Sequence, residues 1–376
     1  MSDSKLHDLI ALAREPSSDR RRELLREVTD LFLAQPDARL DTAQIGLFDD
    51  VMSHLANEME EAVRAELSAR LSTGHASPPK LMHGLARDSF VVAEPVLRGS
   101  MLSEDELVQL ARTQGQNHLR AISQRQAVPE AVSEVIVERG DDETLNVLLR
   151  NDSARLSRDA SEAAVDRAHA NPELHAAVVE RASLPADLLN EMYFVVEARL
   201  RETIMAKNAA LDPADLQAAL DAGRRRIAAR DGALPADYEE AEREVRRLVL
   251  HGELKPATLT GFMRLGSKTK LTIALAELAE IDFSTARRVL EGGQIDPMAI
   301  VCKAAGFDRA LFLTLTIVML NGESSVIGKA QAYGTLYEQL TRDAAQRAVR
   351  FWRLRRQAGP APELVSERLS ERTWAA

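Results

Sequence analysis

The sequence predicts an all-α protein built largely from short helix pairs that stack on one another as an α-solenoid. Two observations support this prediction. Apolar residues make up 45% of the 376 residues but aromatic residues only 4%, whereas sheet proteins usually carry more aromatic and β-branched residues. In addition, a turn pattern recurs about every 28 residues in the middle of the chain, and periods of this length indicate repeat architectures.

The repeat is centred on four turns, each of which contains an apolar residue between two expected helices. These turn residues are Leu102, Val128, Leu156 and Leu184. They lie 26, 28 and 28 residues apart, and each is followed directly by Ser or Pro. Ser can cap a helix, and Pro suits the first helical turn, where a missing amide hydrogen costs nothing. Each turn is therefore expected to end one helix and start the next.

Two short helices fit between successive turns. Apolar residues in segments 129–140 and 142–151 follow helical spacing, and a glycine with acidic residues separates the two segments. A helix of about ten residues is unstable alone in water. We therefore expect each pair to be stabilised by stacking on its neighbours, which is the architecture of a solenoid.

The rest of the chain reads as helical segments around these repeats. The stretch "STGHASPP" marks a joint before the repeats because it contains a glycine and two prolines. The predicted parts are an N-terminal helical segment, 1–75; helical repeats, 76–205; a charged helical linker, 206–254; a C-terminal helical module, 255–345; and a basic helix end with a mobile tail, 346–376.

Arginines recur with the same period as the turns. Arg112, Arg139 and Arg167 occupy equivalent places, and Arg125 and Arg181 form a second column, 56 residues apart. One interpretation is an exposed basic stripe for an acidic partner. The other is a structural ladder, in which each guanidinium hydrogen-bonds turn carbonyls or acidic residues of the adjacent repeat. We favour the ladder, but the sequence leaves both open.

The runs that carry the repeat resemble an uncharacterised bacterial family. They are "LARDSFVVAEPVLRGSMLSEDELVQLA", "AVPEAVSEVIVERGDDETLNVLLRN" and "PELHAAVVERASLPADLLNEM". Together with upstream runs such as "RRELLREVTDLFL", they are similar to the domain of unknown function 2336 over most of residues 6–205, and more loosely over 270–315. The resemblance implies an all-helical protein with HEAT-like repeats. It implies no activity and supplies no catalytic residues.

One tripeptide, Gly292-Gly293-Gln294, is the signature of proteins that release finished peptides from transfer RNA. A catalytic copy would sit on an exposed loop with basic flanks, but Glu291 and Asp296 are its close neighbours. A helix that ends at the glycines and another that starts just after them explain the same residues without chemistry. We do not expect a hydrolase.

A second run, "VMLNGESSVIGKA", resembles a phosphate-binding loop. Five residues rather than four separate Gly322 from Gly328, and Ala330 stands where a magnesium-binding Ser or Thr belongs. The helical periodicity around the run favours a buried helix. We predict no nucleotide and no other cofactor.

No catalytic or metal-binding residues are predicted. The eight histidines show no zinc spacing, and Cys302 is interpreted as a core residue because nothing nearby in sequence would lower its pKa. A single cysteine suits a reducing compartment, and no apolar run reaches the roughly 20 residues that a membrane span requires. We expect a cytoplasmic protein.

The most basic stretch, residues 341–356, carries six arginines and one aspartate. Its arginines suit an acidic partner, a membrane surface or RNA. The favoured alternative is a terminal helix that docks its apolar edge on the second module and leaves its arginines in solvent.

The expected function is that of a non-enzymatic scaffold or adaptor that binds another protein, in regulation or signalling. Repeat stacks offer a long concave surface rather than a cleft of convergent polar groups, and the net charge of -10 argues against a surface designed for phosphate. The alternative is a nucleic-acid-binding HEAT-like protein with an arginine-lined concave face. The residues predicted to bind the partner are Arg125, Arg181, Arg347, Arg350 and Trp352.

Overall fold

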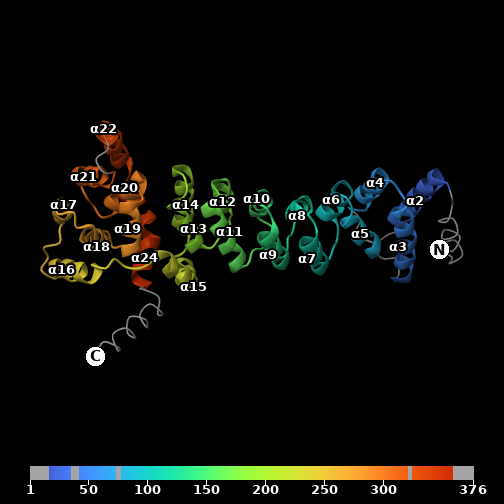
Figure 1. Ribbon diagram of the computed structural model, residues 1–376, viewed down its shortest axis with the longest axis horizontal. Coiled ribbons are helices and arrows are strands. Elements are labelled where there is room, and N and C mark those ends of the chain that lie inside the picture. The colour runs from blue at the N-terminus through green and yellow to red at the C-terminus, as the bar shows by residue number, and fades with distance from the viewer. Residues whose placement is uncertain (1–16, 35–41, 73–77, 321–323, 359–376) are drawn as a thin grey trace, which may run out of the picture. The chain divides into compact units, whose positions relative to one another are not determined.

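The computed structural model describes residues 17–34, 42–72, 78–320 and 324–358 (Figure 1). Every named secondary-structure element in these ranges is a helix, so the all-α prediction is confirmed there. The chain divides into two compact units, residues 1–183 (unit 1) and residues 184–376 (unit 2). The predicted tail beyond residue 358 lies outside the described residues.

Unit 1 consists of short helices joined by short turns. They are α2 (Ser18–Leu33), α3 (Thr42–Asn57), α4 (Glu61–Leu71), α5 (Pro79–Ala86), α6 (Phe90–Gly99), α7 (Glu104–Thr113), α8 (Gln116–Ser123), α9 (Glu130–Arg139), α10 (Asp142–Arg150), α11 (Arg158–Ala170), the 3-10 turn η1 (Pro172–Leu174) and α12 (His175–Glu180). Helices two places apart in the chain pack together, so that α6, α8, α10 and α12 form one row and α7, α9 and α11 another. The packing starts before the predicted repeats, because α3 already packs on α5 and α4 on α6.

The helix starts predicted at the turns follow from local capping. Ser103 makes a capping box with Glu106 at the start of α7, and the Ser157 side chain accepts a hydrogen bond from the amide of Ala160 at the start of α11. These two caps are confirmed. Pro129 lies one place earlier than predicted, as the N-cap residue of α9.

The core of unit 1 lies between the two rows and is aliphatic. Its fully buried side chains include Leu110, Ile122, Ile136, Leu148 and Val178. Each such side chain contributes roughly 1.5–3 kcal/mol relative to leaving it exposed. Because successive helices share this core, a hairpin buries its apolar side only against its neighbours.

Unit 2 consists of α13 (Ala186–Met192), α14 (Ala198–Ala210), α15 (Pro213–Asp231), α16 (Tyr238–Leu250), α17 (Pro256–Arg264), α18 (Lys268–Ala279), α19 (Phe283–Glu291), α20 (Ile295–Ala304), α21 (Arg309–Met319), α22 (Ser324–Gln339), α23 (Arg342–Ala348) and α24 (Arg350–Ala358). Its last helices return to its first ones, since α23 packs on α14 and α24 on α15. The predicted division of the chain cuts through α14 at 205 and through α23 at 345, because the sequence shows charge and apolar content but not which distant helices meet.

Aromatic side chains close unit 2 where its ends meet. Trp352 of α24 stacks on Phe194 at 5.6 Å between ring centroids and meets Tyr193 edge-on at 5.1 Å. Trp352 is only 2% exposed. None of the helices in the described ranges combines the length and apolar character that crossing a bilayer requires.

Candidate functional site

Three polar side chains fasten the turns after α6, α8 and α10 to the next hairpin. We call Arg125, Asn151 and Arg181 the first ladder. Arg125 donates to the carbonyl oxygens of Leu97 and Ser100. Asn151 donates to those of Ser123 and Arg125, at 2.8 and 2.7 Å.

Arg181 is the most deeply placed member of the first ladder. It donates to the carbonyl oxygens of Leu149 and Asn151, at 3.0 and 3.1 Å, and to that of Ala154. Its residue is 3% exposed, and burial lowers its pKa from the usual value. Because helix ends leave carbonyls without partners, each step of the ladder satisfies the end of one hairpin with a donor from the next.

A second ladder joins the other row of helices. Arg139 of α9 donates to the carbonyl oxygens of Ala111 and Gln114 at the end of α7. Arg167 of α11 donates to that of Gly140 at 2.8 Å and pairs with Asp142. Arg112, which has the same place in the sequence period, is exposed and makes no hydrogen bond to a residue that the structure describes.

The structure thus supports the ladder interpretation for four of the five repeated arginines. Sequence reasoning missed Asn151, which fills the gap between Arg125 and Arg181. The available signal was its position, 26 residues after one arginine and 30 before the other. An asparagine was overlooked because a short neutral side chain does not belong to a charge pattern.

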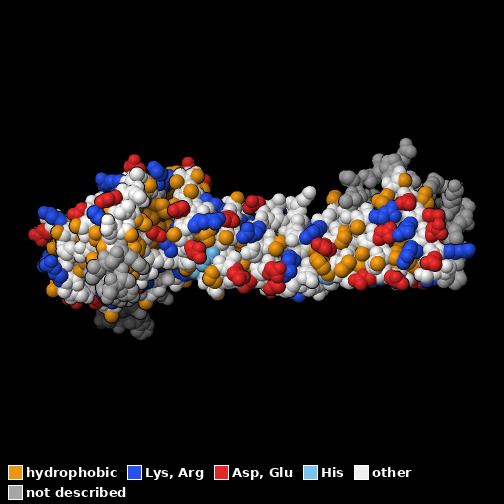
Figure 2. Space-filling view, turned by 90° about the horizontal axis from the view of Figure 1, so that it is seen from above, with side chains coloured by type: hydrophobic (Ala, Val, Ile, Leu, Met, Phe, Trp, Pro, Cys, Tyr) orange, Lys and Arg blue, Asp and Glu red, His pale blue; other side chains and the backbone are white. Residues whose placement is uncertain are grey.

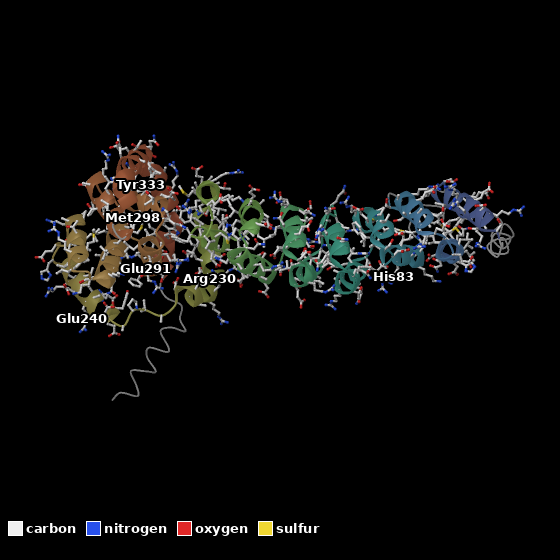
Figure 3. All side chains as sticks on the ribbon, turned by 45° about the horizontal axis from the view of Figure 1, so that its top comes forward. His83, Arg230, Glu240, Glu291, Met298 and Tyr333 are labelled. Carbon is white, nitrogen blue, oxygen red and sulfur yellow. The ribbon has the colours of Figure 1, made fainter. Side chains whose placement is uncertain are left out.

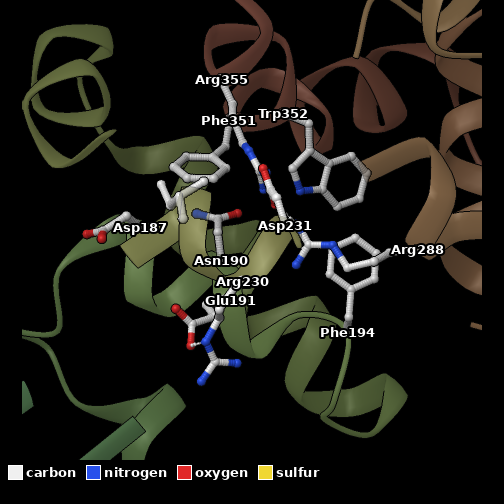
Figure 4. Close-up of a pocket in the computed structure, with 11 residues that line it drawn as sticks. Asp187, Asn190, Glu191, Phe194, Arg230, Asp231, Arg288, Phe351, Trp352 and Arg355 are labelled. Atoms are coloured by element: carbon white, nitrogen blue, oxygen red, sulfur yellow. Dashed lines mark hydrogen bonds and ion pairs between the residues drawn. The ribbon is translucent and has the colours of Figure 1, made fainter. Parts of the chain in front are cut away.

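The five residues predicted to bind a partner are divided between the two units. Arg125 and Arg181 belong to the first ladder, and Trp352 is buried against Phe194 in unit 2 (Figure 4). Arg350 is half-buried and donates to the carbonyl oxygen of Leu211 at 3.3 Å, whereas Arg347 is exposed. Their role in partner binding stays a prediction, and the geometry gives four of them internal contacts.

The basic stretch forms α23 and α24, and its apolar edge is docked as expected. Its arginines, however, are less solvated than expected. Arg355 pairs with Asp231 and lies 3.5 Å from Asp282, and Arg356 pairs with Glu277 at 2.7 Å. Carboxylates of α15, α18 and the turn before α19 therefore neutralise this helix inside unit 2.

The charged residues of unit 1 are distributed unevenly between its rows. The helices α7, α9 and α11 carry nine acidic residues and four arginines, whereas α6, α8, α10 and α12 carry four acidic residues and three arginines. Glu130, Glu134 and Glu138 follow one another at helical spacing on α9, and all three are exposed. We call the exposed side of α7, α9 and α11 the acidic face.

Charges of both signs alternate elsewhere on unit 1. Figure 2 shows acidic and basic side chains intermingled over α2–α4, where Arg26 pairs with Glu66 at 2.7 Å and Arg70 pairs with Asp30. Exposed pairs of this kind contribute little to stability. Because they mix both signs of charge, this surface would not attract a partner of one charge. The acidic face is the more asymmetric surface.

The tripeptide Gly292-Gly293-Gln294 joins two helices. Helix α19 ends at Glu291 (Figure 3) and α20 starts at Ile295, so the predicted helix end and helix start are confirmed. Gln294 turns inward and donates to the carbonyl oxygen of Phe194 at 3.2 Å. A residue that positions water for hydrolysis would instead face a substrate.

The remaining motifs also lie in helices. Met319 ends a helix where a phosphate-binding loop requires a strand, and Gly328 lies inside α22, while Gly322 lies outside the described residues. Cys302 is fully buried beside Met298, with 3.6 Å between the sulfurs, and burial raises its pKa far above the usual value. Among the described residues, no three His, Cys, Asp or Glu side chains are grouped to hold a metal ion.

Comparison with known proteins identifies a family. The sequence model of a family described as "Uncharacterised protein conserved in bacteria (DUF2336)" matches residues 92–350. A search of curated proteins and a search of solved structures found no match.

Proposed function

The chain belongs to this uncharacterised bacterial family, and we propose that it is a protein-interaction scaffold whose unit 1 is a HEAT-like α-solenoid. The description of the family assigns no activity, so the proposal depends on geometry. Two rows of helices that pack on their second neighbours along the chain are what a solenoid requires. The two ladders add polar contacts that repeat with the same period as the hairpins.

The acidic face is the observation that carries the proposal. Arg139 and Arg167 use their guanidinium groups on backbone carbonyls of the neighbouring hairpin, and Arg158 pairs with Glu162 at 2.6 Å. The arginines of this row are thus largely engaged, while Glu130, Glu134 and Glu138 are exposed. A net negative charge along stacked helices attracts and orients a positively charged partner.

The partner that fits this surface is a basic segment of another protein. The nucleic-acid alternative finds less support, because Arg181 is buried and Arg125 is half-buried. An acidic face also repels phosphate. Lysine- or arginine-rich segments would bind by charge complementarity and would be displaced by salt.

Charge reversal of the acidic face tests the proposal. The double variant Glu134→Lys/Glu138→Lys is compared with Glu143→Lys/Glu240→Lys, which makes the same charge change at exposed residues of α10 and α16. Affinity capture from the native host is followed by mass spectrometry and by direct titration of the captured protein. We expect the double variant of α9 to lose the partner and the control pair to retain it.

Two results would count against the proposal. Equal recovery of the partner by both pairs would place the contact elsewhere on the chain. Steeply salt-dependent binding to duplex DNA by the wild-type protein, unchanged by either pair, would favour the nucleic-acid alternative.

A further inference from the structure

One edge of unit 2 carries positive charge that its own acidic residues do not balance. Residues 245–268, which run from the end of α16 through α17 to the start of α18 (Figure 1), include five lysines and arginines and one acidic residue, Glu253. The five cationic residues are all exposed: Arg246, Arg247, Lys255, Arg264 and Lys268. We call these five residues, together with Leu250 and Leu265, the basic edge.

The cationic side chains of the basic edge have few partners within the protein. Four of them make no hydrogen bond or ion pair with a residue that the structure describes: those of Arg246, Arg247, Arg264 and Lys268. Glu244, the acidic residue of α16 closest to them in sequence, already pairs with Lys270 at 2.5 Å. The other acidic residues of α16 lie in its first half. The positive charge of the basic edge is therefore available to an external anion.

Two strongly exposed leucines lie among these cations. Leu250 ends α16 and is 79% exposed, and Leu265 follows α17 and is 78% exposed; no other large apolar side chain that the structure describes exceeds them. Helical spacing places Arg246 and Arg247 on the same side of α16 as Leu250, and Arg264 directly precedes Leu265. The dipole of a helix favours cations in its last turn, but it does not account for leucines that remain in solvent.

We propose that the basic edge binds the surface of an anionic lipid bilayer, with Leu250 and Leu265 among the acyl chains and the cations at the headgroups. Buried apolar area and attraction to anionic lipids are the two contributions that hold an amphipathic surface at a membrane interface. Each Lys or Arg close to such a surface strengthens binding about fivefold. This inference concerns unit 2 and goes beyond the function proposed for unit 1.

The two leucines favour lipid over other anionic partners. Cations and hydrogen-bond donors bind the phosphate backbone of a nucleic acid, and an exposed leucine adds nothing to that contact. An acidic protein would need apolar patches placed between its carboxylates to cover the same residues. A bilayer offers anionic headgroups and acyl chains at every point of its surface, so it matches cations and leucines together.

The net charge of -10 does not prevent this contact. Exposed charges separated by more than the Debye length, about 8 Å at physiological ionic strength, are largely screened from one another. The basic edge therefore meets the lipid with its own local charge. Acidic surfaces elsewhere on the protein are repelled, so the charge distribution orients the protein with the basic edge toward the bilayer.

Cosedimentation with lipid vesicles tests the proposal on the full-length protein. Vesicles of phosphatidylcholine and the anionic lipid phosphatidylglycerol in equal parts are compared with vesicles of phosphatidylcholine alone. The measured quantity is the lipid concentration that binds half of the protein. We expect the wild-type protein to bind the mixed vesicles about tenfold more tightly or better, and we expect raised salt to release it.

A pair of arginine substitutions tests the charges of the basic edge. Arg246→Gln/Arg247→Gln should weaken binding to the mixed vesicles about tenfold or more. Arg112→Gln/Arg155→Gln makes the same charge change at exposed residues of unit 1, and it should leave binding unchanged within about twofold.

A pair of leucine substitutions tests the insertion of apolar side chains. Leu250→Gln/Leu265→Gln should weaken binding about tenfold or more, because two apolar side chains no longer enter the bilayer. Val91→Gln/Met101→Gln is the control, since Val91 and Met101 are 62% and 76% exposed in unit 1, and it should bind as the wild type does. Circular dichroism verifies that each variant is folded, and Leu250→Gln alone serves if the leucine pair is not.

Three results would overturn the proposal. The first is wild-type protein that does not bind the mixed vesicles or that binds both kinds of vesicle equally. The second is an arginine pair or a leucine pair of the basic edge that binds as tightly as its control pair. The third is duplex DNA that displaces the wild-type protein from the vesicles and binds the leucine pair as tightly as the wild type, because this result would assign the basic edge to nucleic acid.

Discussion

At the scale of single residues, four of the repeated arginines of unit 1 act as hydrogen-bond donors to the backbone of the neighbouring hairpin. Arg181 donates to four carbonyl oxygens at the end of α10 and in the turn that follows. A buried carbonyl that loses its partner costs free energy, so the role of Arg181 depends on its donors as much as on its charge. Met has a flexible, unbranched side chain but no donors.

The first prediction concerns this donor role. Arg181→Met should lower the free energy of unfolding by about 3 kcal/mol, because it leaves buried carbonyls without partners. Arg112→Met, at the exposed arginine of the other column, should change it by less than about 0.5 kcal/mol. Urea denaturation of both variants measures the difference. Equal effects would mean that the contacts of the first ladder add nothing to stability.

The second prediction concerns pH and the ion pair between Arg64 and Asp88. Arg64 donates to Asp88 at 2.5 and 2.9 Å and to the carbonyl oxygen of Met59 at 2.6 Å, and its hydrogen bonds hold the pKa of Asp88 below the usual 3.8. A depressed pKa in the folded state stabilises the protein above pH 3.8, and this stabilisation is lost as the pH falls through the folded pKa.

Asp88→Asn isolates this contribution. At pH 7 the variant should be less stable than the wild type by about 1 kcal/mol, a value reduced for the partial exposure of the pair. The difference should shrink as the pH falls below 3.8. Urea denaturation of both proteins between neutral and acidic pH provides the check, and a difference that stays constant would contradict the linkage.

At the scale of elements, α24 shows that a basic helix can be an internal part of a unit. Phe351 and Trp352 bury its apolar edge, and Arg355 meets carboxylates of α15 and of the turn before α19. Composition alone suggests a surface helix. The acidic partners lie 70 to 125 residues earlier in the chain, and a charge count within one helix does not reveal them.

The third prediction tests the docking of α24. Trp352→Ala removes a fully packed ring and should destabilise the protein by about 3–5 kcal/mol. Arg347→Ala, on the exposed side of the neighbouring helix α23, should have an effect below about 0.5 kcal/mol. Thermal unfolding followed by circular dichroism compares the two. Similar stabilities would show that α24 is not docked through its aromatic edge.

At the scale of the whole molecule, the period of the hairpins organises unit 1. The turn residues Val128 and Leu156 are equivalent and 28 residues apart, and α7 packs on α9 as α9 packs on α11. When repeats contact only their neighbours, the free energy of unfolding is close to the sum of the stabilities of the repeats and of the interfaces between them. A whole repeat should therefore be removable, whereas half a repeat should not.

The fourth prediction follows from this periodicity. Removal of residues 128–155 joins Ala127 to Leu156 and lets α11 pack on α7, with Arg167 in the place of Arg139. We expect this variant to stay folded and to unfold cooperatively. Removal of residues 128–141 eliminates α9 but leaves α10, so the rows no longer alternate and the variant should be much less stable. Circular dichroism and urea denaturation measure both, and equal stability of the two would exclude a periodic stack.

The sequence by itself determined the helical class, the turn positions and the caps at Ser103 and Ser157. The apolar spacing of a helix and its capping depend on residues a few places apart, so the sequence alone shows them. It also favoured the ladder, which repeats in register along the chain. Only the tertiary structure decided that Asn151 completes the ladder and that α24 is neutralised inside unit 2. Those facts depend on which distant carbonyls and carboxylates come within hydrogen-bonding distance, and packing alone sets those distances.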